Sequence, residues 1–267
     1  MSEYNRSAYI MDHPAEGRRL ADKVDAPGWM QRYYASYIDR SAAVLSVGCG
    51  PGHFLDAIAT QYPHVGVTGV DVSAARVGDA RKRNERHQNV SVIQGDIHNL
   101  PIDSDSFDFV EARFLFEYLK DKKQASAELA RVCRPGGVVC LQDLDGQLVF
   151  YYPEDDRIQR LQDVLLQLGH TGFDVFVGRK LFALAKNAGL VDLDVRIDSY
   201  HVIAGAIGAF DFDLWRRKLA IAEPIIAQAC GTETAREVIS GFLDYLQDEN
   251  TLTYSMLFTV TGRKLGR

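Results

Sequence analysis

The 267-residue chain has few cysteines and no long apolar run. Its four cysteines show neither CxxC spacing nor His-rich surroundings, so the sequence supports no zinc site and no disulfide framework. No stretch is apolar over the length that a bilayer requires, and the N-terminal segment lacks the apolar core of a signal peptide. We therefore expect a cytoplasmic protein with reduced thiols, no bound metal and no membrane contact.

Basic residues are also scarce, because 30 lysines and arginines stand against 36 aspartates and glutamates, a net charge of -6. This balance repels a phosphate backbone unless a local basic stripe overrides it. The densest basic cluster, residues 81–86, falls inside a predicted helix and is interpreted as its solvated face. Nucleic acid is therefore not expected as a substrate.

From about residue 42 onward, short apolar runs alternate with longer helical stretches, as in βα units that build a parallel sheet. The predicted strands are Val44–Val47, Gly66–Val70, Val90–Gln94, Phe107–Glu111, Val138–Leu141, Leu190–Val202 and Thr253–Thr261. The predicted helices are Phe54–Tyr62, Ala74–His87, Lys122–Arg134, Asp155–Leu168, Lys180–Ala188, Asp213–Ala229 and Glu233–Asp248. No linker or repeat interrupts the pattern, which predicts an α/β fold in a single domain, residues 1–267.

Two local features mark helix ends in this pattern. Ser73 is the predicted N-cap of the helix that begins at residue 74. Pro135, Gly136 and Gly137 are suited to a tight turn. We expect that turn to stop one helix and to deliver the chain into the fifth strand.

The first strand runs directly into the glycine-rich segment GCGPGHF, residues 48–54, and a helix follows. Gly48, Gly50 and Gly52 permit a sharp strand-to-helix turn and let a ligand lie on the backbone near a helix N-terminus. The spacing is GxGxG, whereas the dinucleotide fingerprint is GxGxxG. The loop therefore disfavours an NAD-dependent oxidoreductase.

Polar groups follow three more strands at the same predicted sheet edge. Asp71, at the end of the second strand, stands where Rossmann-type folds hold a ribose diol. Beyond the third strand, the Asp96 carboxylate could accept from an adenine amino group and the Ile97 amide could donate to a ring nitrogen. Ala112 and Arg113 end the fourth strand, so four strand ends converge on one crevice.

These motifs together resemble the class I S-adenosylmethionine-dependent methyltransferases, especially the enzymes of ubiquinone and menaquinone biosynthesis and of natural products. The resemblance covers residues 40–145 and rests on five segments in the family's order and spacing. They are VLSVGCGPGHF at 44–54, GVDVS at 69–73, GDIHNLP at 95–101, SFDFV at 106–110 and RVCRPGGVV at 131–139. It implies a Rossmann-like, doubly wound, seven-stranded and mostly parallel sheet with an antiparallel last strand and helical lid additions.

The resemblance also implies the cofactor, S-adenosyl-L-methionine, and a separate role for each of three segments of the chain. Residues 1–40 would form a helical lid, 41–145 the cofactor-binding core, and 146–267 the substrate-side helices with the last two strands. Asp71 would bind the ribose, Asp96 and Ile97 the adenine, and the glycines with the Ala112 and Arg113 backbone the methionine end. The implied cofactor residues are Arg19, Gly48, Cys49, Gly50, Gly52, Phe54, Asp71, Val72, Asp96, Ile97, Ala112 and Arg113.

The chain departs from the family pattern at Ser46, where the family usually has an acidic residue two positions before the first glycine. Loss of that carboxylate removes one partner for the cofactor's ammonium group, directly or through water, so another group must help or affinity falls. Arg19, in the segment EGRRL, resembles the arginine of an N-terminal element that closes near the cofactor's carboxylate.

Aromatic residues cluster after the strands that carry these motifs, and they suit an apolar or planar acceptor. They are Phe114, Phe116 and Tyr118, then Phe150, Tyr151 and Tyr152, then Phe210, Phe212 and Trp215. If the acceptor is a hydroxyl or an ammonium, a general base must take its proton. No spacing singles one out among the candidates, which are Tyr9, His13, His98, His170, His201 and Asp143.

The sequence therefore predicts in-line transfer of a methyl group from S-adenosylmethionine to a small apolar or aromatic metabolite, a reaction of secondary metabolism. The alternative is a protein of the same fold that binds this cofactor in a non-methylating role, as a rearrangement catalyst or a binding module. Monomer and homodimer both remain open, as do O-, N- and C-methylation.

Overall fold

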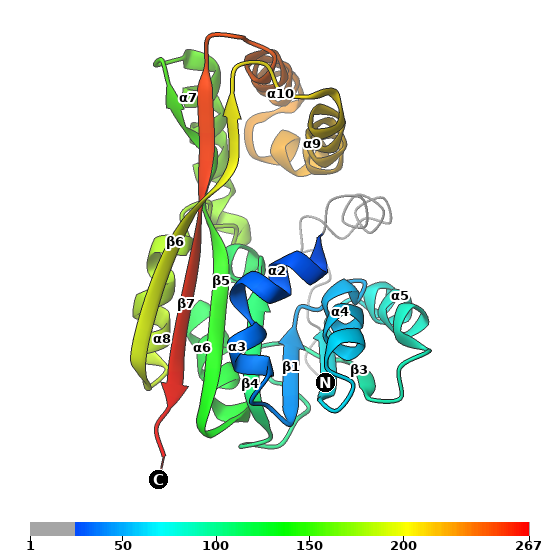
Figure 1. Ribbon diagram of the computed structural model, residues 1–267. Coiled ribbons are helices and arrows are strands. Elements are labelled where there is room, and N and C mark those ends of the chain that lie inside the picture. Colours follow the sequence, from blue (N-terminus) through cyan, green and yellow to red (C-terminus); the bar gives the residue numbers. More distant parts are fainter. Residues whose placement is uncertain (1–24, 267) are drawn as a thin grey trace.

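Residues 25–266, which the computed structural model describes, form a seven-stranded sheet with helices on both faces (Figure 1). The strands are β1 Ala43–Val47, β2 Gly66–Asp71, β3 Val90–Gln94, β4 Phe107–Arg113, β5 Cys133–Tyr152, β6 Leu190–Ala204 and β7 Leu252–Lys264. They lie in the order β3-β2-β1-β4-β5-β7-β6. β7 runs antiparallel to both neighbours, and the pairs among β1 to β5 are parallel. The predicted fold class is confirmed.

The strand order reverses between β1 and β4, because the chain proceeds from β1 outward to β3 and then returns to β4 on the other side. In sheets of this kind, ligands bind at such a switch point, outside the carboxyl ends of the strands. The carboxyl ends of β1, β2 and β4 are held side by side by the pairs Val47–Val70 and Val47–Ala112. The sequence motifs therefore meet at one edge.

Two apolar layers hold the helices against this part of the sheet. Alternate residues of a strand face opposite sides, so Val44 and Phe109 join one layer while Leu45 and Val110 join the other. The first layer packs against α2 Ala26–Tyr33, α3 Ala35–Ile38 and α4 His53–Gln61, with α5 Ala74–Asn84 beside α4. The second packs against α6 Lys122–Val132 and α8 Leu181–Asn187.

The sheet continues far beyond the switch point, because β5, β6 and β7 have 20, 15 and 13 residues. Around their extended ends lie α7 Asp156–Gln167, α9 Ala209–Cys230 and α10 Thr232–Leu246 (Figure 1). These helices and strand ends share a separate apolar cluster that includes Leu161, Trp215 and Phe242. We call this part of the molecule the distal lobe. Three short 3-10 turns, Phe116–Tyr118, Leu168–Thr171 and Gly178–Lys180, complete the described elements.

The prediction for β5 was wrong in length, since the strand is not confined to Val138–Leu141. Pro135 to Gly137 lie within the strand rather than in a separate turn. The pairs Phe107–Cys133 and Phe109–Val138 leave extra residues of β5 looped out, with Gly136 at φ 80°. A second irregularity follows Asp145, where Gly146 has φ 72°. Bulges bend a strand, and the bulge at Gly146 lies where β5 enters the distal lobe.

The other predicted elements exist, with ends that differ by a few residues. The largest differences are at α9, which begins at Ala209, at α5, which ends at Asn84, and at β7, which ends at Lys264. Ser73 does occupy the N-cap position of α5. None of the helices described is long and apolar enough to cross a membrane. The proposed division into lid, core and substrate side stays a prediction, and most of the lid segment, residues 1–24, lies outside the described residues.

Candidate active site

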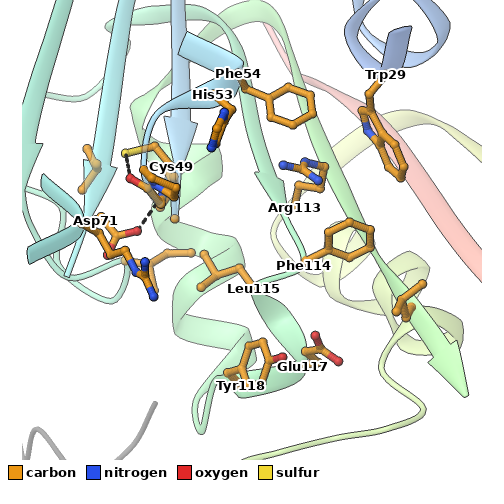
Figure 2. A pocket seen from close by; sticks show the side chains of 18 of the residues that line it. Trp29, Cys49, His53, Phe54, Asp71, Arg113, Phe114, Leu115, Glu117 and Tyr118 are labelled. Carbon is orange, nitrogen blue, oxygen red and sulfur yellow. Dashed lines mark hydrogen bonds between the residues drawn. The ribbon is translucent and has the colours of Figure 1, made fainter. Parts of the chain in front are cut away.

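A cavity of about 600 Å³ opens at the switch point and extends toward the distal lobe. The loops after β1, β2, β3 and β4 line one part of it, and α2, β6 and α9 contribute to the rest. Figure 2 shows this cavity, with the glycine-loop residue Cys49 and Asp71 on one side and Trp29 on the other. Several elements far apart in the sequence therefore share one space.

The glycine loop is shaped by three left-handed residues, since Gly48, Gly50 and Gly52 have φ values of 72°, 54° and 78°. At Gly52 a Cβ atom would stand only 3.0 Å from the Ala80 backbone, so this glycine is needed for the packing of α4 on α5. At Gly50 nothing lies within 4 Å of an added Cβ. The Gly50 backbone thus borders open space, where a ligand can approach it closely.

Asp71 ends β2 and is held rigidly by two backbone amides. Gly50 N donates to its Oδ2 and Ser73 N to its Oδ1, both at 2.9 Å. These two amides fix the orientation of the carboxylate, which can accept about four hydrogen bonds in all. The same bonds tie the carboxylate to the glycine loop, and both line the cavity.

Asp96 lines the cavity beyond β3 and accepts two hydrogen bonds from His98, from its backbone N at 2.9 Å and its Nδ1 at 2.7 Å. Ile97, which is 6% exposed, lines the cavity beside it. His98 itself is not among the lining residues. Its contact with Asp96 makes it a support for the cavity wall.

Arg113 lies among aromatic rings at the end of β4 (Figure 2). Its guanidinium carbon is 3.8 Å from the ring centre of Phe54, 5.0 Å from that of Phe114 and 5.3 Å from that of Trp29. These are distances of cation–π contact. Phe114 has φ 51°, a strained conformation for an aromatic residue, and this backbone turn directs the chain across the cavity.

A buried polar network closes the cavity on the side of the distal lobe. Glu117 lines the cavity at 4% exposure and accepts a short hydrogen bond from Gln147 Nε2. Lys218 Nζ donates to Gln147 Oε1 at 2.5 Å and lies 4.9 Å from the Trp215 ring centre. The network joins a carboxylate from a 3-10 turn, a neutral amide from the β5 bulge and an ammonium group from α9.

Asp143 lies behind this network and is completely buried. Its carboxylate accepts from Glu117 N at 3.1 Å and from Leu144 N at 2.8 Å. Burial, and then the negative charge of Glu117, raise the pKa of Asp143 well above its usual range. Burial thus favours the protonated form of Asp143.

The structure brings most of the predicted cofactor residues to this cavity. Those that line it are Gly48, Cys49, Gly50, Phe54, Asp71, Val72, Asp96, Ile97 and Arg113. Gly52 and Ala112 do not line it, because Gly52 packs on α5 and Ala112 is buried beneath the sheet edge. Burial and the negative charge of Asp71 raise the pKa of the Cys49 thiol, which therefore stays protonated.

The predicted bases are distributed differently. His201 lines the cavity, whereas His98 and Asp143 do not, and His170 is exposed on a 3-10 turn. Tyr9, His13 and Arg19 lie outside the described residues. Of the predicted aromatic wall, Phe114 and Tyr118 line the cavity, while Phe116 is fully buried in the core.

Several lining residues were not predicted from the sequence. Trp29 and Tyr33 come from α2, Tyr200 from β6, and Lys218 from α9. No motif marks these positions, since their place depends on long-range packing. Glu117 is marked in the sequence as the one acidic residue in the apolar run Phe114–Leu119. A lone charge in such a run is expensive to bury without a partner.

Comparison with known proteins shows what the central part of this chain is similar to. A family model described as a methyltransferase domain matches residues 44–137, from β1 into β5. Demethylmenaquinone methyltransferase of Staphylococcus epidermidis is 33% identical over 107 residues, which are 39% of this chain and 44% of that protein. The chain spans less than two thirds of the length of the first curated relatives that it matches.

Solved structures share the fold over most of the chain. The YcgJ protein of Bacillus subtilis matches with a TM-score of 0.60 and 21% identity, covering 90% of this chain and 99% of that one. The [4+2]-cyclase SpnF matches with a TM-score of 0.54 and 17% identity, covering 87% and 79%. The family model and the solved structures agree: residues 44–137 are similar to a methyltransferase domain, and the chain shares the fold of these structures over most of its length.

Proposed function

We propose that this protein binds S-adenosylmethionine in the switch-point cavity and methylates a small molecule with an apolar or aromatic body. The observation that carries the proposal is the cavity itself, which joins the glycine loop and Asp71 to an aromatic-walled space on the same edge of the sheet. When bound, the cofactor would supply a sulfonium-activated methyl group for in-line displacement by the acceptor.

The residues present fit this cofactor. The Asp71 carboxylate is oriented by two amides and would accept from the ribose hydroxyls. The open space at Gly50 would receive a ligand directly on the backbone, which any side chain there would fill. Asp96 and the Ile97 amide would bind the adenine. Arg19, outside the described residues, stays a predicted contact for the cofactor's carboxylate.

The acceptor side of the cavity favours an apolar or planar molecule. Trp29, Phe114 and Tyr200 pack together there, with ring centres 5.6 to 5.8 Å apart, and Tyr118 lies beyond them. Trp29 is fixed by a 2.8 Å hydrogen bond from its Nε1 to Gln142 Oε1. Fixed aromatic faces orient an acceptor, and orientation contributes much of the rate of such a transfer.

Glu117 is the best placed proton acceptor for a hydroxyl or ammonium acceptor. It lines the cavity, whereas Asp143 is completely buried behind it and does not line the cavity. Its carboxylate is fixed by Gln147, which in turn accepts from Lys218. We assign to Glu117 the removal of the acceptor's proton, and to Lys218 with Gln147 the positioning of that carboxylate.

Two measurements on the purified chain test the proposal. Calorimetric titration with S-adenosylhomocysteine is expected to show one site, and methyl-labelled S-adenosylmethionine is expected to label a small product in a metabolite extract. Absence of binding by folded protein would refute the proposed cofactor site. Labelling of RNA, DNA or protein without a labelled small product would refute the proposed acceptor class.

Only the methyl-labelling measurement distinguishes the proposed methyltransferase from a protein that binds the cofactor in a non-methylating role. SpnF, named as a cyclase, shares this fold, and a fold does not by itself determine the reaction. Tight binding of S-adenosylhomocysteine without any labelled product, across extracts of varied composition, would favour the alternative.

A further inference from the structure

Ser46 leaves position 46 without a carboxylate, yet a carboxylate lies beside it. Ser46 on β1 and Glu111 on β4 are partners in the parallel ladder, and Ser46 Oγ donates a short hydrogen bond to Glu111 Oε1. Both side chains face the layer of α2 and α4, on the same side of the sheet as Tyr34 and Phe54. The neighbouring strand thus supplies an acidic group within one hydrogen bond of the position at which the sequence lacks it.

The Glu111 carboxylate is incompletely satisfied. The residue is 3% exposed, and its Oε2 has no hydrogen-bond partner among the described residues. A buried carboxylate oxygen without a partner is unfavourable, so buried charges normally find a donor or a counter-ion. Burial raises the pKa of Glu111, and the charge of Arg113 opposes that effect.

The hydrogen bonding of the Arg113 guanidinium is also incomplete. It lies two residues along β4 from Glu111, so both side chains point to the same side of the strand, and it lines the cavity. Its Nε is buried without a hydrogen-bond partner in the described part of the chain. Aromatic rings surround its guanidinium but provide no hydrogen-bond acceptor. A carboxylate and a guanidinium, each with one buried atom that lacks a partner within residues 25–266, therefore lie on the same side of β4, with Arg113 lining the cavity and Glu111 buried behind the lining residues.

We propose that Glu111 and Arg113 together bind the amino-acid end of the cofactor, Glu111 taking its ammonium group and Arg113 its carboxylate. A zwitterionic ligand group supplies the donor that Glu111 lacks and the acceptor that Arg113 lacks. Glu111 acts directly or through a water beside Ser46, so the carboxylate missing from β1 is replaced from β4. This inference rests on the proposed cofactor site and names the residues that select its methionine end.

The test compares S-adenosylhomocysteine with its deamino analogue, in which hydrogen replaces the ammonium group, by calorimetric titration. The wild-type chain is expected to bind S-adenosylhomocysteine roughly tenfold to a hundredfold more tightly, as for a hydrogen bond between charged groups. Glu111→Gln is expected to remove most of this preference and to leave the affinity for the analogue unchanged. Equal wild-type affinity for the two compounds would overturn the proposal, whether or not any variant folds.

Two further variants separate binding from structural support. Ser46→Asp combined with Glu111→Gln moves the carboxylate back to β1 and is expected to restore part of the preference. Glu128→Gln, which removes a carboxylate at 9% exposure from α6, is the matched control and is expected to change neither affinity. If Glu111→Gln lowered the affinity for both compounds equally, Glu111 would have a structural role and the proposal would be wrong. If folded wild-type protein bound neither compound, the proposed function would fail first.

Discussion

The cofactor side of the cavity and its acceptor side are built in different ways. On the cofactor side, the Gly48–Phe54 loop, Asp71, Asp96 and Arg113 each lie at or just beyond the end of a short parallel strand. On the acceptor side, Trp29, Glu117, Tyr200 and Lys218 come from four elements spread over nearly the whole described chain. The first arrangement is fixed by local backbone geometry, whereas the second depends on how the distal lobe packs.

This difference indicates that acceptor binding can change without a change in cofactor binding. A ligand bound by strand ends requires a definite backbone at each end, so few substitutions preserve it. An acceptor held between a helix, a bulge and a long strand can be altered by side chains alone. Variants on the cofactor side should therefore change cofactor affinity, and variants on the acceptor side should change turnover.

The largest effect is expected from Gly50→Val. A branched side chain would fill the open space where the cofactor meets the backbone, at a φ of 54° that valine rarely adopts. S-adenosylhomocysteine binding should fall below detection in calorimetry. Gly189→Val is the matched control, since Gly189 has φ 81° and equally open surroundings away from the cavity. Retained binding in Gly50→Val would place the cofactor elsewhere.

Glu117→Gln should show the opposite pattern, with turnover reduced and cofactor affinity preserved. Loss of a general base typically costs about 10²–10⁴-fold in rate. The expected result is a fall of that order in kcat with S-adenosylhomocysteine affinity within about twofold of wild type. His201→Ala removes the other lining candidate and should cost much less. The assignment would be wrong if His201→Ala, folded and binding cofactor, lost all turnover while Glu117→Gln did not.

Asp71→Ala should weaken cofactor binding without abolishing it. It removes two charge-assisted hydrogen bonds to the ribose, each contributing about 1.5–3 kcal/mol before water compensates. Affinity for S-adenosylhomocysteine should therefore fall roughly tenfold to several hundredfold.

The alanine variant also frees the Gly50 and Ser73 amides that hold the loop. Asp71→Asn keeps one acceptor oxygen for an amide and should retain more affinity than Asp71→Ala. Circular dichroism should show both variants folded, because the residue lies at a strand end. Wild-type affinity in both would mean that Asp71 does not contact the ligand.

The contrast between the two sides also sets how much could be predicted from the sequence. Glycine spacing and residues that follow apolar runs are local signals, and they correctly placed the strand ends that meet at the cavity. β5 was predicted too short. Pro135 to Gly137 were expected to form a turn, whereas Gly136 lies in a bulge of the strand, and β5 continues through a second bulge at Gly146. A strand that continues through a bulge carries no continuous apolar run.

The acceptor side could not be predicted for a related reason. Trp29 lies 84 positions before Arg113 in the chain, and no pattern in either segment indicates that the two side chains meet. Lys218 lies on a predicted helix, and its contact with Gln147 depends on the bulge that turns β5 toward α9. The sequence showed that position 46 lacks an acidic residue, but it did not show that Glu111 lies beside Ser46. That proximity depends on the register between β1 and β4.

The smallest effect on cofactor binding is expected in the distal lobe, from Phe242→Ala. Phe242 is 1% exposed and packs with the Trp215 ring at 5.7 Å, so truncation should cost about 3–5 kcal/mol of stability. S-adenosylhomocysteine affinity, measured where the variant remains folded, should stay within about twofold of wild type, because distant sites contribute independently. Phe54→Ala is the matched variant on the cofactor side, at 5% exposure beneath Arg113. Its lost cation–π contact should lower affinity roughly threefold to thirtyfold. Equal losses of affinity in the two variants would show that the distal lobe and the cofactor side act as one unit, and the separation argued from their construction would not hold.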